Sequence, residues 1–134
     1  MLGEGKEFTE FITKAKSFNV DNRIIYRGYV PYDLVPCYLK ASDLCLFPSL
    51  SEGFGNSIIE AMAAGLPTII FKNIYIEEFG SNILVANDNE EFIELTKRLV
   101  YDKNYACEIG KKCAKDAEKL SISNTVEKFL KIFS

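Results

Sequence analysis

The stretch DLCLFPSLSEGFGNSIIEAMAAGLPTIIF, from Asp43 to Phe71, is the most informative part of this 134-residue chain. It begins and ends with a short, almost wholly apolar segment, which is typical of a strand that is buried on both faces of a parallel sheet. Between these segments, a loop with two glycines leads into a helical segment over residues 56–64, with Gly65 as its C-cap. The order strand, loop, helix, strand predicts an α/β fold.

The flanking segments extend this pattern. Apolar residues at helical spacing predict a helix over residues 6–18, and RIIYRG predicts a strand at residues 23–28. A helix is expected over residues 31–42, with Pro31 in its first turn, and a strand over residues 82–86 (NILVA). The remaining apolar positions predict three carboxyl-terminal helices: one with Phe92, Leu95 and Leu99, a polar one over residues 105–119, and one with Val126, Phe129, Leu130 and Phe133.

Strands that alternate with helices are typical of a parallel sheet with helices on both faces. We therefore predict an α/β fold with a partial Rossmann-like parallel sheet, in one domain over residues 1–134. In such folds, ligands bind beyond the carboxyl ends of the strands.

The composition of the chain excludes some classes of function. The chain is 48% hydrophobic and 26% charged, as ordinary globular domains are, and its net charge of −3 supplies no electrostatic reason to expect nucleic acid as a partner. No apolar run approaches the roughly 20 residues that span a bilayer, and the first residues lack the basic and apolar regions of a signal peptide. We expect a cytoplasmic protein.

The residue types also limit the chemistry. The four cysteines, Cys37, Cys45, Cys107 and Cys113, form no C-x-x-C pair, and the chain has no histidine, so a structural metal site is not expected. Without histidine, a Ser-His or Cys-His nucleophile is also excluded within this chain. Any catalysis must use carboxylates, backbone donors and lysine or arginine.

The EGFG loop is the first candidate site. Gly53 and Gly55 allow a tight turn between a strand and a helix, where free N–H groups and the helix dipole favour an anion such as phosphate. Asn56 and Ser57 add donors in the first helical turn. The alternative is a plain strand-to-helix turn with Ser57 near the N-cap.

Two glutamates, Glu52 and Glu60, lie eight residues apart across this loop. A carboxylate at Glu60 can accept two hydrogen bonds from a ribose diol, as the acidic residue of dinucleotide folds does. Alternatively, Glu60 is a first-turn acid favoured by the helix dipole or the partner of a lysine. Glu52 is either a site residue or a solvated loop residue.

Taken together, SEGFGNSIIEAMAAGLPTII strongly resembles the E-x7-E region of retaining glycosyltransferases of family four, which have the GT-B arrangement of two Rossmann-like domains. LGEG (residues 2–5), IIYRGYV and DLCLFPSLSEGFG are similar to further segments of that family, so the likeness covers nearly the whole chain. The resemblance implies the second half of a GT-B carboxyl-terminal domain.

The resemblance also implies a nucleotide-sugar donor site without a metal ion or other cofactor. Glu60 would hold the donor ribose, and Glu52 would act as the catalytic residue beside the donor sugar. The other implied donor-binding residues are Gly53, Phe54, Gly55, Asn56 and Ser57 in the loop and first helical turn, and Gly28, Tyr29 and Val30 beside the base.

The chain also departs from the family. KNIYIEEFGSN replaces a glycine-rich turn with a following acidic residue, which puts the donor-sugar contacts there in doubt. The acceptor-binding amino-terminal domain, the first strand of the donor domain and the basic residues that clamp the diphosphate are missing. We therefore expect a fragment, or one half of a split enzyme, that is inactive alone.

The predicted function is the donor-binding part of a retaining glycosyltransferase that acts on a glycan or lipid-linked acceptor in surface polysaccharide synthesis. The full-length enzyme is expected to associate peripherally with the inner face of the membrane. The alternatives are a non-catalytic nucleotide-sugar-binding module or subunit, and an unrelated Rossmann-like phosphate-binding enzyme.

Overall fold

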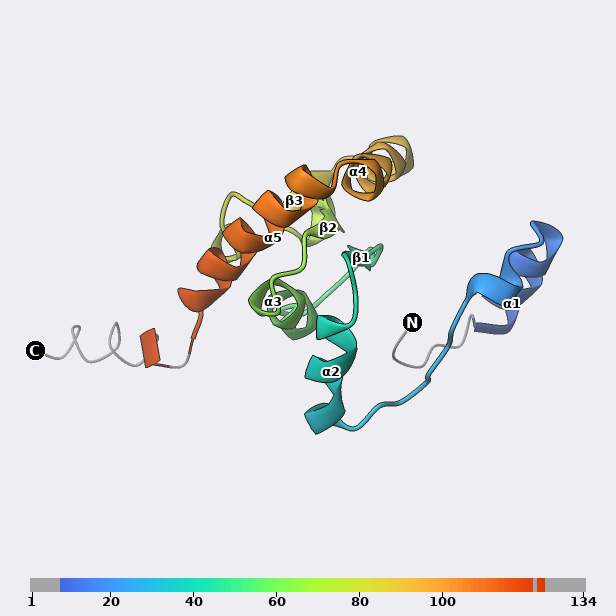
Figure 1. The fold of residues 1–134 in the computed structure, drawn as a ribbon, viewed down its shortest axis with the longest axis horizontal. Coiled ribbons are helices and arrows are strands. Elements are labelled where there is room, and N and C mark those ends of the chain that lie inside the picture. Colours follow the sequence, from blue (N-terminus) through green and yellow to red (C-terminus); the bar gives the residue numbers. More distant parts are fainter. Residues whose placement is uncertain (1–7, 122, 125–134) are drawn as a thin grey trace, which may run out of the picture. The chain divides into compact units, whose positions relative to one another are not determined.

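A computed structural model describes residues 8–121 and 123–124, and the chain divides into two units, Met1–Val35 and Pro36–Ser134. Figure 1 shows the elements of both units in chain order. The predicted last helix, with Val126 and Phe133, lies outside the described residues. Within the described part, no helix is both long enough and apolar enough to cross a bilayer.

A three-stranded parallel sheet forms the centre of the second unit, as predicted. It contains β1 (Cys45–Phe47), β2 (Thr68–Phe71) and β3 (Leu84–Ala86) in the order β1-β2-β3. Every residue of β2 is buried, which explains why this strand reads as apolar almost throughout.

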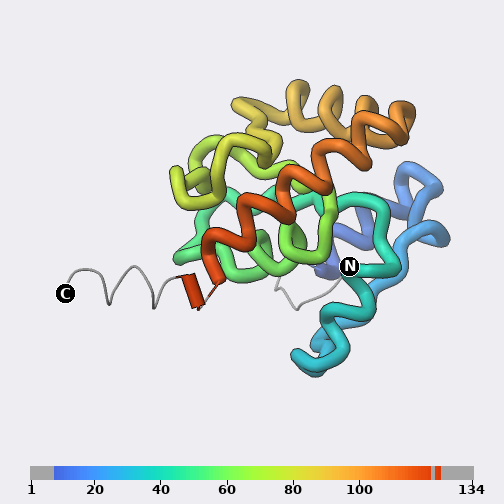
Figure 2. The backbone as a smooth tube through the Cα atoms, turned by 60° about the vertical axis from the view of Figure 1, so that its left-hand side comes forward, coloured from blue at the N-terminus to red at the C-terminus, as the bar shows by residue number. Residues whose placement is uncertain are grey.

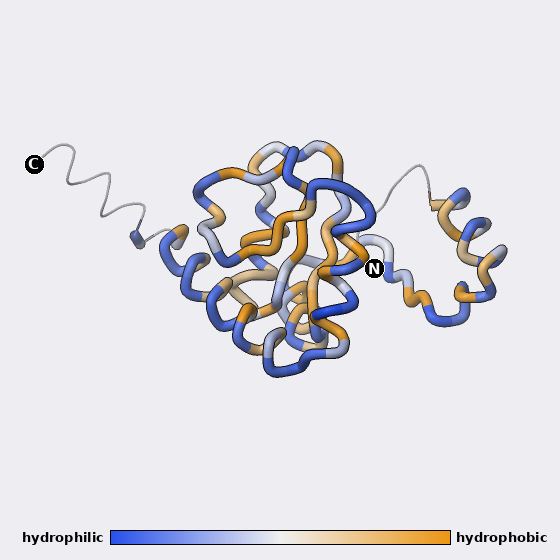
Figure 3. The backbone as a smooth tube through the Cα atoms, turned by 90° about the horizontal axis from the view of Figure 1, so that it is seen from above, coloured by the Kyte–Doolittle hydropathy of each residue, from blue (hydrophilic) through white to orange (hydrophobic). Residues whose placement is uncertain are grey.

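Helices cover both faces of this sheet, which confirms the predicted α/β layout. On one face, Ile70 packs with Ile58 of α3 (Asn56–Ala63) and Cys113 of α5 (Lys103–Glu118). On the other face, Ile69 packs with Phe92 of α4 (Asn89–Tyr101). Figure 3 shows the hydrophobic strands at the centre of this unit and hydrophilic segments around them.

Helices α3 and α5 lie side by side, and two glycines allow their close approach (Figure 2). Ala64 is the C-cap of α3, so the predicted cap at Gly65 is one residue too late. Gly65 follows the cap with a φ of +80°, the left-handed conformation that commonly ends a helix. A Cβ atom on Gly110 of α5 would lie 2.2 Å from the carbonyl oxygen of Gly65. No side chain fits between these backbones.

The first unit contains α1 (Phe8–Ser17), η1 (Asp21–Arg23) and η2 (Tyr32–Leu34). Helix α1 confirms the described part of the predicted helix. Its apolar stripe is only partly covered within this unit, since Ala15 is buried but Phe18 is 68% exposed. Helix α2 (Val35–Lys40) follows η2 directly, and Pro31 precedes η2.

The prediction of a strand at residues 23–28 is wrong. Arg23 ends the turn η1, and Ile24 is extended but lies outside the sheet that the described residues form. A strand needs both an apolar pattern and a neighbouring strand that shares its ladder of hydrogen bonds. The RIIYRG segment has the pattern, but the described residues of its unit include no second strand.

Two short turns connect β2 to β3: η3 (Lys72–Ile74) and η4 (Glu77–Phe79). Strand β3 and helices α4 and α5 confirm the remaining predictions for the described residues. Aspartate side chains start both helices, because Asp88 accepts from the N–H of Glu91 and Asp102 accepts from the N–H of Tyr105, each at 2.9 Å.

Candidate functional site

The glycine loop, residues 48–55, leaves the carboxyl end of β1 and enters α3. Gly55 is the N-cap of α3 with a φ of +75°, a conformation that favours glycine. A Cβ atom there would also lie 3.0 Å from Ile58 Cδ1 and 3.1 Å from Phe79 Cζ. Both the backbone conformation and the tight space around Gly55 therefore favour glycine at the start of the helix.

The first turn of α3 presents backbone donors. The carbonyl of Gly55 accepts from the N–H groups of Ile58 at 2.9 Å and Ile59 at 3.3 Å. The N–H groups of Asn56 and Ser57 precede these donors, so they have no carbonyl within the helix to bind, and both residues are exposed. This is the arrangement that binds anions at a helix N-terminus.

Ser57 is not an N-cap. It is the second residue of α3, and the N-cap Gly55 has no side chain to accept a hydrogen bond. The alternative of a plain turn capped near Ser57 therefore lacks its capping bond, because a side-chain oxygen at the N-cap is what supplies it.

Glu52, Gly53 and Phe54 are exposed on the glycine loop. The loop is held at its start, where Asn73 Nδ2 donates to the carbonyl of Leu50 and Ser49 Oγ donates to the carbonyl of Ser51. Within the part of the chain that the structure describes, the Glu52 carboxylate has no hydrogen bond or ion pair. It is free to meet a ligand at the carboxyl end of the sheet.

Glu60 is half-buried on α3, beside the buried Ala61 and Met62. Its backbone carbonyl accepts from the N–H of Ala64 at 3.0 Å. No described residue makes a hydrogen bond or ion pair with its carboxylate, so the described residues contain no lysine partner for it. A half-buried carboxylate without a protein partner is a suitable acceptor for ligand hydroxyl groups.

Gly28, Tyr29 and Val30 belong to the first unit, whereas Glu52, Glu60 and the residues between them belong to the second. Gly28 has a φ of +60°, which explains the glycine in this turn, and Tyr29 is 76% exposed. Their predicted role beside a base stays a prediction.

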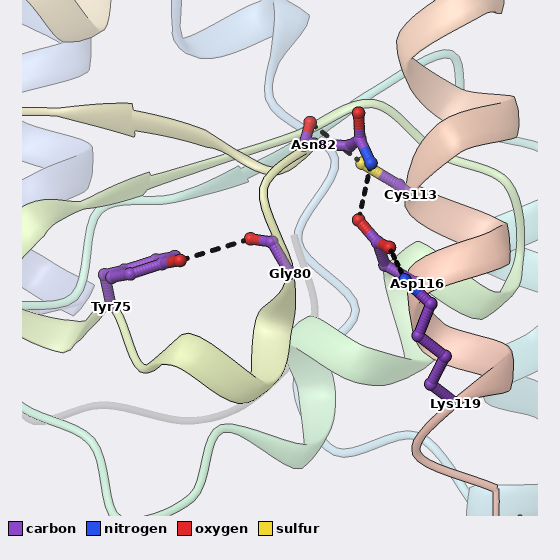
Figure 4. A network of polar contacts seen from close by, with 6 residues as sticks. All are labelled: Tyr75, Gly80, Asn82, Cys113, Asp116 and Lys119. Carbon is purple, nitrogen blue, oxygen red and sulfur yellow. Dashed lines mark hydrogen bonds and ion pairs between the residues drawn. The ribbon is translucent and has the colours of Figure 1, made fainter.

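A partly buried polar network lies next to this site, and its residues were not predicted from the sequence (Figure 4). Asp116 Oδ2 on α5 accepts from Asn82 Nδ2 at 2.7 Å, and its Oδ1 accepts from Lys119 Nζ at 2.6 Å. Tyr75 Oη donates to the carbonyl of Gly80 at 3.3 Å. The only feature of the sequence that points to Asp116 is the presence of an acidic residue between Cys113 and Ala117, on the apolar face of a helix.

Opposing effects act on the pKa of Asp116. Burial favours the neutral acid, but the hydrogen bonds from Lys119 and Asn82 outweigh it, so the pKa lies below its ordinary value of 3.8. Asp116 is therefore ionised at neutral pH.

The remaining features do not add to the site. A cavity of about 420 Å³ lies at the opposite, amino-terminal ends of the strands, between Asp43 before β1, Pro67 before β2 and Lys111 of α5. Burial raises the pKa of the Cys45 thiol to about 11, so this cysteine is not a reactive thiolate. Among the described residues, no three of the acidic residues and cysteines form a metal-binding group.

Comparison with known proteins shows matches along most of the chain. A family described as "Glycosyl transferases group 1" matches residues 1–102. The chain is 37% identical over 73 residues to 2-deoxystreptamine N-acetyl-D-glucosaminyltransferase from Niallia circulans, which covers 54% of this chain and 19% of that protein. It is 34% identical over 90 residues to an Escherichia coli UDP-Gal:alpha-D-GlcNAc-diphosphoundecaprenol alpha-1,3-galactosyltransferase, covering 63% and 23%. The chain thus spans about a fifth of the length of these curated relatives.

Solved structures share the fold. A mutant of Staphylococcus aureus TarM, in complex with Fondaparinux, alpha-GlcNAc-glycerol and UDP, matches with a TM-score of 0.81 and 26% identity over 99% of this chain and 28% of its own. Anabaena HepE in complex with UDP matches with a TM-score of 0.79 and 20% identity, covering 97% and 39%, and shows the fold alone.

Proposed function

This chain belongs to the group 1 glycosyl transferases, and we propose that it forms the donor-binding part of a retaining enzyme of that family. The enzyme would transfer a sugar from a nucleotide-sugar to a glycan or lipid-linked acceptor in surface polysaccharide synthesis. The names of the relatives support this substrate class: the Escherichia coli relative is named for a UDP-galactose donor and a diphosphoundecaprenol-linked acceptor.

The observation that carries the proposal is the start of α3. Gly55 places the N–H groups of Asn56 and Ser57 at the carboxyl end of β1, where they suit the diphosphate of a nucleotide-sugar. When the bond between the anomeric carbon and the diphosphate breaks, the leaving diphosphate takes the electron pair. These donors and the helix dipole would stabilise the charge that develops on it.

The two glutamates have separate roles in this proposal. Glu60, half-buried and without a described partner, would accept hydrogen bonds from the ribose hydroxyls. Glu52, at the exposed loop, would lie by the donor sugar and stabilise the positive charge that develops at the anomeric carbon. Gly53 and Phe54 would line the sugar side, and Gly28, Tyr29 and Val30 would border the base. No metal ion is needed, because the helix dipole and backbone donors meet the diphosphate.

We further propose that the complete enzyme acts in the cytoplasm at the inner face of the membrane, where a lipid-linked acceptor is accessible. The second candidate is a nucleotide-sugar-binding subunit without catalysis of its own. Transfer activity after addition of an acceptor-binding amino-terminal half would distinguish the two.

Calorimetric titration of the chain with UDP, GDP and ADP tests the donor site. We expect one of these nucleotides to bind more tightly than the others. Its parent nucleoside, which has the same base and ribose but no diphosphate, is the matched control and should bind much more weakly. Binding of none of the three nucleotides, or equal binding of nucleoside and nucleotide, would contradict a diphosphate site at α3.

A further inference from the structure

Asp116 occupies an unusual place for a charged residue. It is only 4% exposed, and it is the one buried charged side chain among the described residues. Its two carboxylate oxygens accept from Asn82 and Lys119. Burying a carboxylate costs free energy unless it is paired and hydrogen-bonded. Packing alone therefore does not explain why a charged residue occupies this position.

The carboxylate packs directly against Gly80. A Cβ atom on Gly80 would lie 2.5 Å from both Cγ and Oδ2 of Asp116, and Gly80 has a φ of +77°, a conformation that favours glycine. Figure 4 shows Gly80 between two anchors, with Tyr75 on one side and the Asn82–Asp116 pair on the other. The turn at residues 79–82 is therefore held in one conformation by contacts from α5 and from Tyr75.

This turn carries Phe79, whose side chain is 1% exposed. A Cβ on Gly55 would lie 3.1 Å from Phe79 Cζ, so the ring packs against the N-cap of α3. A continuous chain of contacts thus joins Asp116 to the N-cap through Gly80 and Phe79. Packed side chains of this kind can transmit a change at one position to another.

We infer that Asp116 is a positioning residue for the donor site: it holds residues 79–82 so that Phe79 supports Gly55 and the N–H groups of Asn56 and Ser57. This inference rests on the proposed function for the ligand and on the structure alone for the positioning. Asp116 lies beyond residues 1–102, the part that the family description matches. It touches no substrate and acts through Gly80 and Phe79.

The test uses three variants of the whole chain. Asp116→Ala removes both acceptors, and Asp116→Asn keeps the shape and one acceptor oxygen. Glu108→Gln is the matched control, because Glu108 is an acid on the same helix that pairs with Lys112 at 2.6 Å. We expect Asp116→Ala to weaken binding of the preferred nucleotide among UDP, GDP and ADP by about twofold to thirtyfold. Asp116→Asn should recover part of this loss, and Glu108→Gln should bind as the wild type does.

Amide hydrogen exchange supplies a readout that needs no ligand. The N–H groups of Ile58 and Ile59 are protected by the carbonyl of Gly55, and the N–H of Phe92 is protected by Asp88 at the start of α4. If Asp116 positions the N-cap, both Asp116 variants should speed exchange at Ile58 and Ile59 more than at Phe92. Should Asp116→Ala fail to fold, Asp116→Asn carries both measurements.

The outcomes separate the two proposals. If the wild-type chain binds none of the three nucleotides, the proposed function is contradicted, and the exchange comparison still decides the positioning role. If the wild type binds but the Asp116 variants bind equally well, the link to the donor site is overturned. Uniform acceleration of exchange across α3 and α4 would show that Asp116 contributes to global stability alone.

Discussion

Glu60 is the residue whose partner is most open to experiment, because its half-buried carboxylate has no bond to any described side chain. If it holds a ribose diol, Glu60→Ala should weaken nucleotide binding by about 1.5–3 kcal/mol, the value of hydrogen bonds to a charged group. Calorimetry with the preferred nucleoside diphosphate measures this loss. Glu90→Ala, which removes an exposed acid from α4, is the control and should leave the affinity unchanged.

The alternative of a first-turn acid is wrong, because α3 begins at Asn56 and has no acidic residue in its first turn. Unchanged nucleotide affinity in folded Glu60→Ala would therefore mean that Glu60 does not hold the ribose.

Glu52 should affect the reaction more than binding. In an enzyme completed with its acceptor-binding domain, Glu52→Gln keeps the shape but removes the charge near the anomeric carbon. We expect turnover to fall about tenfold to a thousandfold while nucleoside diphosphate affinity changes little, because the interaction forms mainly in the transition state. Turnover and affinity are measured on the same variant. Equal turnover, or a fall explained by lost nucleotide binding, would make Glu52 an ordinary loop residue.

We expect the free energy of unfolding to depend on pH because of Asp116. Its pKa in the folded chain lies below 3.8, so the unfolded chain takes up the proton first as the pH falls. The stability that the carboxylate contributes is therefore complete at neutral pH and is lost as the pH falls below about 4. Urea unfolding should give a difference between wild type and Asp116→Asn of up to about 3 kcal/mol at pH 7.

This difference should shrink as the pH falls from 7 to 3, because the unfolded chain then takes up a proton at Asp116 before the folded chain does. A difference that stays constant between pH 7 and pH 3 would mean that the charge of Asp116 is not what stabilises the turn at Gly80.

At the scale of elements, the contact between α3 and α5 depends on the absence of a side chain. Gly110→Ala should destabilise the chain by about 1–3 kcal/mol or more, because the added methyl group would lie 2.2 Å from the Gly65 carbonyl oxygen. Urea unfolding measures the change. Gly53→Ala is the matched control: nothing lies within 4 Å of its added Cβ, so its stability should stay within about 0.5 kcal/mol of wild type.

If Gly110→Ala proved as stable as the control, the two helices would have to separate without cost. The packing of Ile58 and Cys113 in the shared core argues against that, because both are fully buried.

At the scale of the whole molecule, we expect no sugar transfer by the isolated 134-residue chain. Transfer needs two substrates held in proximity and orientation, which can supply roughly 7–11 kcal/mol of barrier lowering. The donor site proposed here holds one of them. Product analysis with nucleotide-sugar and acceptor tests this, with slow donor hydrolysis as the largest activity expected. Robust transfer by the purified chain would contradict the proposal that it is a donor-binding part.

The local amino-acid pattern was sufficient to predict most of the helices and strands of the second unit. The apolar runs of β1 and β2, the glycines at positions 55 and 65 and the helical spacing of Phe92 and Leu99 each reflect a requirement that lies within a few residues. Periodicity reports which face of an element is buried, and a glycine reports a backbone conformation. These are local properties, so the amino-acid pattern was enough to predict the three strands of the sheet, the helices that cover them and the glycine loop.

Features that depend on contacts between residues far apart in the sequence could be seen only in the tertiary structure. Residues 23–28 have a strand's composition, but they lie outside the sheet that the described residues form, and periodicity within a segment does not report which strand it pairs with. Gly80 and Asp116 are separated by 36 positions along the chain, yet the carboxylate packs on the glycine and their turn places Phe79 against Gly55. Contacts between distant residues depend on how the elements pack. The sequence therefore located the glycine loop, and the packing of Phe79 against Gly55 became visible only in the structure.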